Sequence, residues 1–342
     1  MRLLVWLLGF WVVKEKRDEE MKREKTHLPT KMSSFVLTDG CLLAGGCNSC
    51  GQLGLGNASD VPGLWCVSDQ KFIMVSCTYQ HTMAIDKNGF LWGCGSNRFG
   101  QLGLDDYSDK TILVCVSQQK FAFVSCGKDH TAAIDNEGFL WLCGNNEDGQ
   151  CTGKIKWRSF PIQVPQTKFV TVSCGGGHTM VIDQFGYLWG CGNNDSGQLG
   201  LGIADGNSHK KLMLVPTHQK KFSTVRCAEN ATLAIDEDGY LWFCGQSECF
   251  FNWKIDFGDL STYTLTKIST QKFLAVDCGF EHIVALDEDQ CLWCNISECN
   301  GSERTASLMK INEEKFFKKP KKILLLNVGW SNKGNVALVN ST

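Results

Sequence analysis

The sequence predicts an all-β protein in which similar four-stranded sheets follow one another around a ring. The main observation is a repeat with a period near fifty residues, which is most complete in residues 72–103. Such a period is typical of stacked units that cannot each bury a core alone. The first repeated cysteine, Cys77, recurs at spacings of 49, 48, 53 and 51 residues. The repeated positions are Cys77, Cys126, Cys174, Cys227 and Cys278; Asp86, Asp135, Asp183, Asp236 and Asp287; Trp92, Trp141, Trp189, Trp242 and Trp293; and Cys94, Cys143, Cys191, Cys244 and Cys294.

The second observation is a partial unit at each end of the repeat. Residues 40–45 align with residues 89–94, so the array begins late in a unit. Residues 322–329 and 335–339 resemble only the first half of a unit. We therefore expect the N-terminal and C-terminal strands to complete one sheet together, which closes the ring and removes two exposed strand edges.

Each unit is expected to hold about four strands of 4–6 residues joined by turns. Residues 72–77 and 81–86 are almost continuously apolar, which predicts strands covered on both faces. Asp86 and Gly89 have the spacing of a hairpin turn, in which the Asp side chain accepts a backbone amide and the Gly takes positive φ. Trp92 and its repeats are expected to form an aromatic layer between sheets.

The chain contains 19 cysteines, and ten of them are the repeated positions within apolar strands. A buried cysteine behaves there as a small hydrophobic residue. Cys47 and Cys50, and also Cys291 and Cys294, have the spacing of zinc ligands, but Cys294 occupies a repeated strand position. We expect no metal. So many unpaired cysteines indicate a reducing compartment, the cytoplasm or the nucleus.

Residues 1–32 lie outside the repeat, and residues 33–342 are predicted to form the ring domain. Residues 3–13 are apolar, and residues 14–25 form a mixed-charge run of helical composition. Eleven residues of helix span roughly 16 Å, about half of a bilayer core, so a spanning helix is not expected. The extension is predicted to be a short helix or disordered. A signal or membrane anchor in residues 1–13 stays open as the alternative.

Charge and motif content argue against nucleic-acid binding and against catalysis. The net charge is −2, from 34 basic and 36 acidic residues, so no basic field would attract nucleic acid or a membrane. One histidine per unit places these side chains around a ring rather than at one point, and Ala231 interrupts the set. Phosphate-binding, zinc-protease and nucleophile-elbow motifs are lacking. We therefore expect no enzyme activity and no cofactor. The histidines are His81, His130, His178 and His282.

Residues 172–200 read Val-Ser-Cys-Gly-Gly-Gly-His-Thr-Met-Val-Ile-Asp-Gln-Phe-Gly-Tyr-Leu-Trp-Gly-Cys-Gly-Asn-Asn-Asp-Ser-Gly-Gln-Leu-Gly. This string resembles the regulator of chromosome condensation repeat family, and it recurs five times between residues 33 and 340. The resemblance implies a β-propeller of four-stranded blades. The best-known members have seven blades, whereas this chain has material for about six, so six or seven are expected. The family name also suggests guanine-nucleotide exchange on a small GTPase.

Function on such a scaffold is expected in loops that depart from the repeat. Residues 154–160 are basic and aromatic, residues 203–211 are an insertion, and residues 249–260 replace a Gly-Gln-Leu-Gly turn. The prediction is a non-catalytic scaffold that binds protein partners of unknown identity. The alternative is an exchange factor that stabilises a nucleotide-free GTPase. The aromatic residues in these loops either anchor a partner or fill the core. The candidate partner-binding residues are Trp157, Arg158, Phe250, Phe251, Trp253 and Phe257.

Overall fold

The structure is a computed structural model. It describes residues 33–164, 167–204, 206, 208–246, 262–279, 283–289, 291–300, 303–310, 323–329 and 335–340. The predicted extension, residues 1–32, lies outside these residues, and the domain boundary at residue 33 stays a prediction. Among the described residues, no helix has the length and apolar character needed to cross a membrane.

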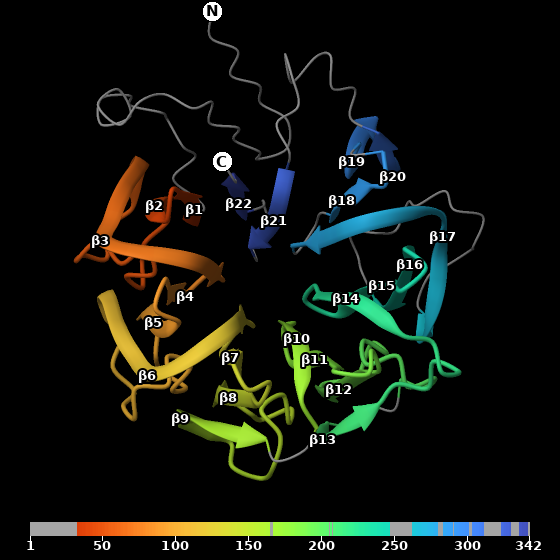
Figure 1. Ribbon diagram of the computed structural model, residues 1–342, viewed down its shortest axis with the longest axis horizontal. Helices are drawn as coiled ribbons and strands as arrows, with labels where there is room; N and C mark the ends of the chain where they lie inside the picture. Colours follow the sequence, from red (N-terminus) through yellow and green to blue (C-terminus); the bar gives the residue numbers. More distant parts are fainter. Residues whose placement is uncertain are drawn as a thin grey trace, which may run out of the picture.

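The described secondary structure consists of strands arranged around a central axis (Figure 1), which confirms the predicted all-β propeller. The strands are β1 (Ser33–Thr38), β2 (Cys41–Gly46), β3 (Val61–Cys77), β4 (His81–Asp86), β5 (Phe90–Gly95), β6 (Lys110–Cys126), β7 (His130–Asp135), β8 (Leu140–Asn145), β9 (Trp157–Val164), β10 (Phe169–Cys174), β11 (His178–Asp183), β12 (Leu188–Gly192), β13 (His209–Leu214), β14 (Phe222–Cys227), β15 (Ala231–Asp236), β16 (Tyr240–Gly245), β17 (Thr262–Cys278), β18 (Ile283–Asp287), β19 (Leu292–Asn300), β20 (Glu303–Lys310), β21 (Ile323–Gly329) and β22 (Asn335–Asn340).

Three strands are long and bent, and each belongs to two successive sheets. The first half of β3 pairs with β2, where Leu43 faces Cys66, and its second half pairs with β4, where Phe72 faces Asp86. Strands β6 and β17 make the same double use of their 17 residues. Each such strand is thus the outermost strand of one sheet and the innermost strand of the next.

The two ends of the chain meet in one sheet, as predicted. Strand β22 pairs in parallel with β1, with Leu37 opposite Val339, and β21 pairs with β22. The strand order in this closing sheet is β21-β22-β1-β2-β3. It has one strand more than the expected four, because β22 and β1 both occupy the place of a second strand. The expected blade number of about six stays a prediction.

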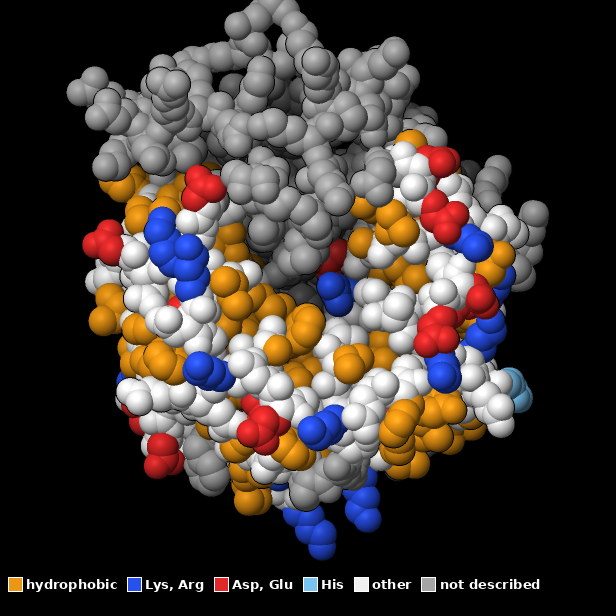
Figure 2. Space-filling view, in the orientation of Figure 1, with side chains coloured by type: hydrophobic (Ala, Val, Ile, Leu, Met, Phe, Trp, Pro, Cys, Tyr) orange, Lys and Arg blue, Asp and Glu red, His pale blue; other side chains and the backbone are white. Residues whose placement is uncertain are grey.

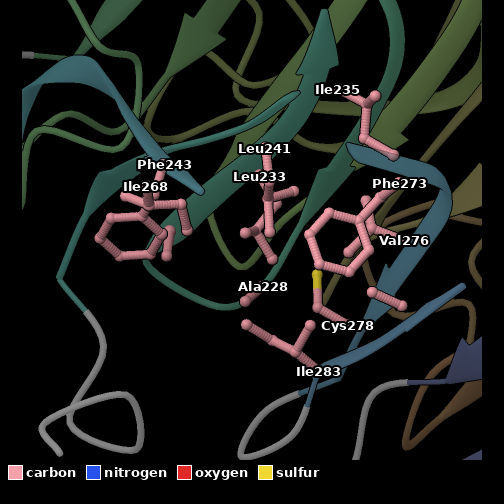
Figure 3. Close-up of a cluster of buried hydrophobic side chains, with 12 residues drawn as sticks. Ala228, Leu233, Ile235, Leu241, Phe243, Ile268, Phe273, Val276, Cys278 and Ile283 are labelled. Carbon is pink, nitrogen blue, oxygen red and sulfur yellow. The ribbon is translucent and has the colours of Figure 1, made fainter. Parts of the chain in front are cut away.

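The hydrophobic core lies between successive sheets rather than at the centre of the ring. In Figure 3, Leu233 and Leu241 from one sheet lie beside Phe273 and Val276 on β17 of the next. Four further clusters repeat this arrangement around the ring. Burying each large side chain contributes about 1.5–3 kcal/mol. The units therefore stabilise one another, as the repeat period predicted.

The two faces of the ring carry different connections. On the turn face, defined by the Asp-x-x-Gly hairpins, Asp86 Oδ1 accepts the amides of Asn88 and Phe90 at 2.8 and 2.9 Å. On the loop face, defined by the Gly-Gln-Leu-Gly loops, Asn97 Oδ1 accepts the amide of Leu102 at 2.9 Å. The predicted hairpin turn is confirmed, with Gly89 at a φ of 88°.

Candidate functional site

The repeated histidines link neighbouring sheets and form no common centre. The Nε2 atoms of His81 and His130 lie 3.1 and 2.9 Å from the hydroxyl oxygens of Thr131 and Thr179 in the next sheet. The Thr131 hydroxyl donates to the Gln101 carbonyl at 2.7 Å, so it accepts from a neutral His81 Nε2–H. Burial lowers the pKa of His81 and His130 to about 3. These side chains are structural, and His282 lies outside the described residues.

The repeated aspartates combine their turn role with a bond to tryptophan. Asp86 Oδ2 accepts the Trp92 Nε1–H at 3.0 Å, and Asp135 Oδ2 accepts that of Trp141 at 2.8 Å. The same pair forms in each later unit. The Trp141 ring also packs edge-on against Phe121, with ring centroids 6.4 Å apart. The tryptophans therefore lie at the edge of the predicted layer between sheets. They are half-buried, and each is held by a hydrogen bond to the aspartate of its own unit.

The repeated cysteines described by the structure are buried, and desolvation raises the pKa of Cys77 and Cys143 to about 12. Thiols of this kind are poor nucleophiles at neutral pH. Cys47 and Cys50, which have zinc-ligand spacing, are partly exposed free thiols. In the described part of the chain, no three His, Cys, Asp or Glu side chains are grouped so that they could hold a metal ion. Cys294 is one of the residues whose side chain is not described.

One contact on the loop face departs from the repeat. Phe99, which precedes the loop glycine Gly100, packs against Trp157 at the start of β9, with ring centroids 5.9 Å apart and planes at 63°. Trp157 is 47% exposed. The contact joins two successive units, because Phe99 follows β5 and β9 is the outermost strand of the next sheet. We call Phe99 and Trp157 the aromatic pair.

The hydrogen bonds between loops and strands fix which residues correspond to the aromatic pair elsewhere. The amide of Asp105 donates to Ser159 O, just as that of Gly56 donates to Thr111 O. Trp157 therefore corresponds to Asp109, two residues before Thr111. The residues that precede the other loop glycines, and so correspond to Phe99, are Cys50, Asp148 and Ser196. Among the described loops, aromatic residues thus occupy both positions of the contact at one site only.

Basic side chains adjoin the aromatic pair in the sequence. Arg98, Lys154 and Lys156 are all exposed. Ile155, which lies between the two lysines in the sequence, is also exposed. Lys156 Nζ lies 3.7 Å from Glu147 Oε1, and both side chains are at least half exposed, so this ion pair is weak. The site is an exposed aromatic centre of the kind that anchors a protein partner.

The other predicted site residues have different positions. Arg158 is buried, and its Nη2 donates to Thr152 O at 2.8 Å, so of the two predicted residues in this segment Trp157 is the one that a partner can reach. Phe250, Phe251, Trp253 and Phe257 lie outside the described residues. In the insertion, the carbonyl of Ile203 accepts from Asn194 Nδ2 at 2.9 Å. Phe99 was missed because only a register-by-register alignment reveals its unusual position.

The ring of repeated sheets, joined by buried polar links between units, defines a repeat β-propeller. The chain belongs to the RCC1-like domain family, whose sequence pattern matches residues 28–324. This match confirms the resemblance to regulator of chromosome condensation repeats. A comparison with curated proteins gives no match.

Solved structures show the same fold at low sequence identity. Human WBSCR16 is 17% identical, with a TM-score of 0.74 over 90% of this chain and 83% of that chain. Prp20p from Saccharomyces cerevisiae is 19% identical, with a TM-score of 0.75 over 91% of this chain and 81% of that chain. Yeast RCC1 (Prp20) bound to Kap60 is 19% identical, with a TM-score of 0.75 over 87% and 76%. At these identities the similarity is one of fold.

Proposed function

We propose that this propeller is a non-catalytic scaffold that binds a protein partner on its loop face, centred on the aromatic pair. The observation that carries the proposal is the exposure of Trp157 against Phe99 at positions that hold polar or small residues in the other described units. Tryptophan and arginine are the residues that most often dominate the energy of a protein interface. A propeller holds such side chains on rigid strands, which lowers the entropic cost of binding.

The test compares Trp157→Ala with the matched variant Trp65→Ala in quantitative affinity purification of the full chain. Trp65 is 60% exposed on the outer strand of another sheet, so it controls for loss of a surface tryptophan. We expect the retention of the main partner to fall at least about tenfold for Trp157→Ala and to stay unchanged for Trp65→Ala. Equal retention by both variants would remove the aromatic pair as the binding site.

The alternative function is guanine-nucleotide exchange on a small GTPase. In this mechanism the propeller binds and stabilises the nucleotide-free form of its partner. The similar yeast protein Prp20p is described by its binding to Gsp1p and histones. A nucleotide-release assay with the purified chain and a panel of GTPases, Gsp1p included, separates the two functions. An absence of acceleration with every member of the panel would leave the scaffold function alone.

We place the protein in a reducing compartment, the cytoplasm or the nucleus. Every cysteine whose side chain the structure describes is a free thiol, and Cys66 is exposed. Exposed thiols oxidise in secreted proteins, where disulfides form and persist. Fractionation of cells that express the tagged full chain tests this placement, and recovery in the medium or in a membrane pellet would contradict it.

A further inference from the structure

A second surface lies on the turn face, at the opposite ends of the strands from the aromatic pair. A lysine precedes the first buried phenylalanine of each repeated unit, where one unit joins the next. Its carbonyl accepts an amide from the turn of its own unit, as Lys120 O does from Asn136. The following amide donates to the glycine of the preceding turn, as that of Phe121 does to Gly89 O. The lysines are Lys71, Lys120, Lys168, Lys221 and Lys272.

The backbone joint also fixes where each lysine side chain runs. The Cβ of Lys120 lies 3.3 Å from the position that a Cβ on Gly89 would occupy, and the Cβ of Lys168 lies 3.1 Å from that position on Gly138. The aliphatic part of each lysine therefore covers the glycine of the preceding hairpin. The lysine side chains therefore start from regularly repeated positions along the turn face, with their ammonium groups in water.

Apolar side chains alternate with these lysines on the same face. A β-bulge follows each lysine, where the register shifts between Phe121 and Phe123 or between Phe169 and Thr171. The residue in the bulge turns outward, which explains why Val170 is 48% exposed although its strand was expected to be covered on both faces. Phe123 is also exposed, and Phe185 at the tip of a hairpin is 57% exposed.

Two lysines of the later units lie close to carboxylates on the turn face. Lys220 is paired with Asp238 at 2.9 Å, and Lys272 lies 4.0 Å from Glu288. By contrast, none of the described carboxylates lies within 4.0 Å of the ammonium groups of Lys120, Lys168 and Lys221. Glu137, Glu237 and Asp238 are exposed acidic residues on the adjacent turns.

We propose that three successive units form a binding surface for an acidic protein segment that also carries apolar side chains. The surface, here named the lysine arc, consists of Lys120, Phe123, Lys168, Val170, Phe185 and Lys221. On the face shown in Figure 2, Lys and Arg side chains are spaced around the ring, and apolar side chains lie between them and toward the centre.

Charge and apolar area together identify the kind of ligand. Three ammonium groups that no described carboxylate approaches within 4.0 Å attract a polyanion, and the whole chain, with its net charge of −2, lacks a general basic field. Exposed Phe123, Val170 and Phe185 give no benefit against a phosphate backbone, but they bury the aliphatic or aromatic side chains of a peptide. An acidic segment with apolar side chains satisfies both features, whereas the phosphates of a nucleic acid satisfy only the first, and aliphatic Val170 offers no ring on which a base could stack.

The experiment measures fluorescence anisotropy of a fluorescein-labelled twelve-residue peptide of Glu-Glu-Leu repeats with the full chain at low salt. We expect Lys168→Glu to weaken binding about fivefold and Lys120→Glu with Lys168→Glu to weaken it at least about tenfold. Val170→Ser, which changes an exposed side chain, is expected to weaken binding about threefold. Lys211→Glu, an exposed lysine on the outer strand β13, is the matched control and should change the affinity less than twofold.

Two further probes decide the ligand class. Twelve-residue oligo-glutamate and a twelve-nucleotide single-stranded DNA should each bind at least about fivefold more weakly than the peptide. Equal affinity for all three probes, together with no effect of Val170→Ser, would replace the proposal with a general polyanion surface. Equal loss for Lys211→Glu and Lys168→Glu would also overturn it. Trp157→Ala should leave peptide binding unchanged, so failure of the lysine-arc proposal can be distinguished from failure of the loop-face proposal.

Discussion

Arg226 on β14 and Asp277 on β17 form an ion pair, with Nε and Oδ1 3.3 Å apart, between two successive units. In three earlier units the position of Arg226 holds a serine, whose hydroxyl oxygen accepts an amide of the next unit. Arginine has no acceptor, so the amide of Cys278 donates instead to Asp277 Oδ1 at 3.0 Å. Arginine at position 226 and aspartate at position 277 thus replace two serines together, and the contact between the two units is preserved. The serine bonds are Cys126 N to Ser76 Oγ, Cys174 N to Ser125 Oγ and Cys227 N to Ser173 Oγ.

The first prediction concerns this pair. Arg226→Ser removes the cation beside the buried Asp277 carboxylate, which is costly because an uncompensated charge remains out of water. The Arg226 side chain is 32% exposed, so we expect a loss of about 2 kcal/mol in the free energy of unfolding, below the value for fully buried pairs. Urea denaturation followed by tryptophan fluorescence measures it.

The matched variant combines Arg226→Ser with Asp277→Ser. It recreates the arrangement of the earlier units, because the serine introduced at position 226 can accept the Cys278 amide. We expect the double variant to recover at least about half of the lost free energy. A double variant that is less stable than both single variants would show that the two changes do not compensate each other.

The second prediction concerns the half-buried tryptophans. Trp141→Ala removes the edge-on contact with Phe121 and leaves Asp135 Oδ2 without its indole donor. We expect a loss of about 3–5 kcal/mol in the free energy of unfolding, through the cavity and the broken bond. Trp141→Phe keeps most of the packing and should lose only about 1–2 kcal/mol. A loss below about 1 kcal/mol for the alanine variant would mean that the layer contributes little to stability.

The sequence predicted the fold well because each feature of one unit could be checked against the same feature in the other units. The spacing of Asp86 and Gly89, copied in later units, identified the hairpins, and the two partial units identified the closing sheet. It failed at Ile73 and Val170, where an apolar run suggested coverage on both faces. The β-bulge that turns such residues outward leaves no mark in a hydrophobic pattern, since it depends on how the strand bends toward the ring.

The candidate site was only partly predictable. Trp157 was identified from its basic and aromatic segment, and its neighbour Arg158 was chosen for the same reason. Yet successive residues of a strand face opposite ways, so the two adjacent side chains have opposite environments. Phe99 lies in a different unit, and its contact with Trp157 depends on how loop and strand meet across the joint. The residues next to either ring in the sequence do not indicate this contact.

The third prediction concerns thiol reactivity. Burial raises the pKa of Cys174 well above its ordinary value, whereas Cys66 is exposed. In labelling of the native protein with a chromogenic disulfide reagent, Cys66→Ala should remove about one rapidly reacting thiol, and Cys174→Ala should remove none. Cys174→Ala should also cost only about 1 kcal/mol of stability and release no metal. Stoichiometric zinc in the purified protein would contradict the packing role.

The last prediction concerns pH. Burial lowers the pKa of His81, His130 and His178 to about 3, against an ordinary value of 6.5 in the unfolded chain. Between these values the unfolded state binds protons that the folded state does not, so this stability is complete above pH 6.5 and is lost as the pH falls toward 3. At pH 5 each histidine should cost about 2 kcal/mol. Urea denaturation at pH 5.0, 6.0 and 7.5 measures the slope of unfolding free energy against pH, and His130→Asn should reduce that slope by about a third. An unchanged slope in the variant would show that His130 takes up protons equally in the folded and unfolded states, and the buried, neutral Nε2–H bond to Thr179 would then be wrong.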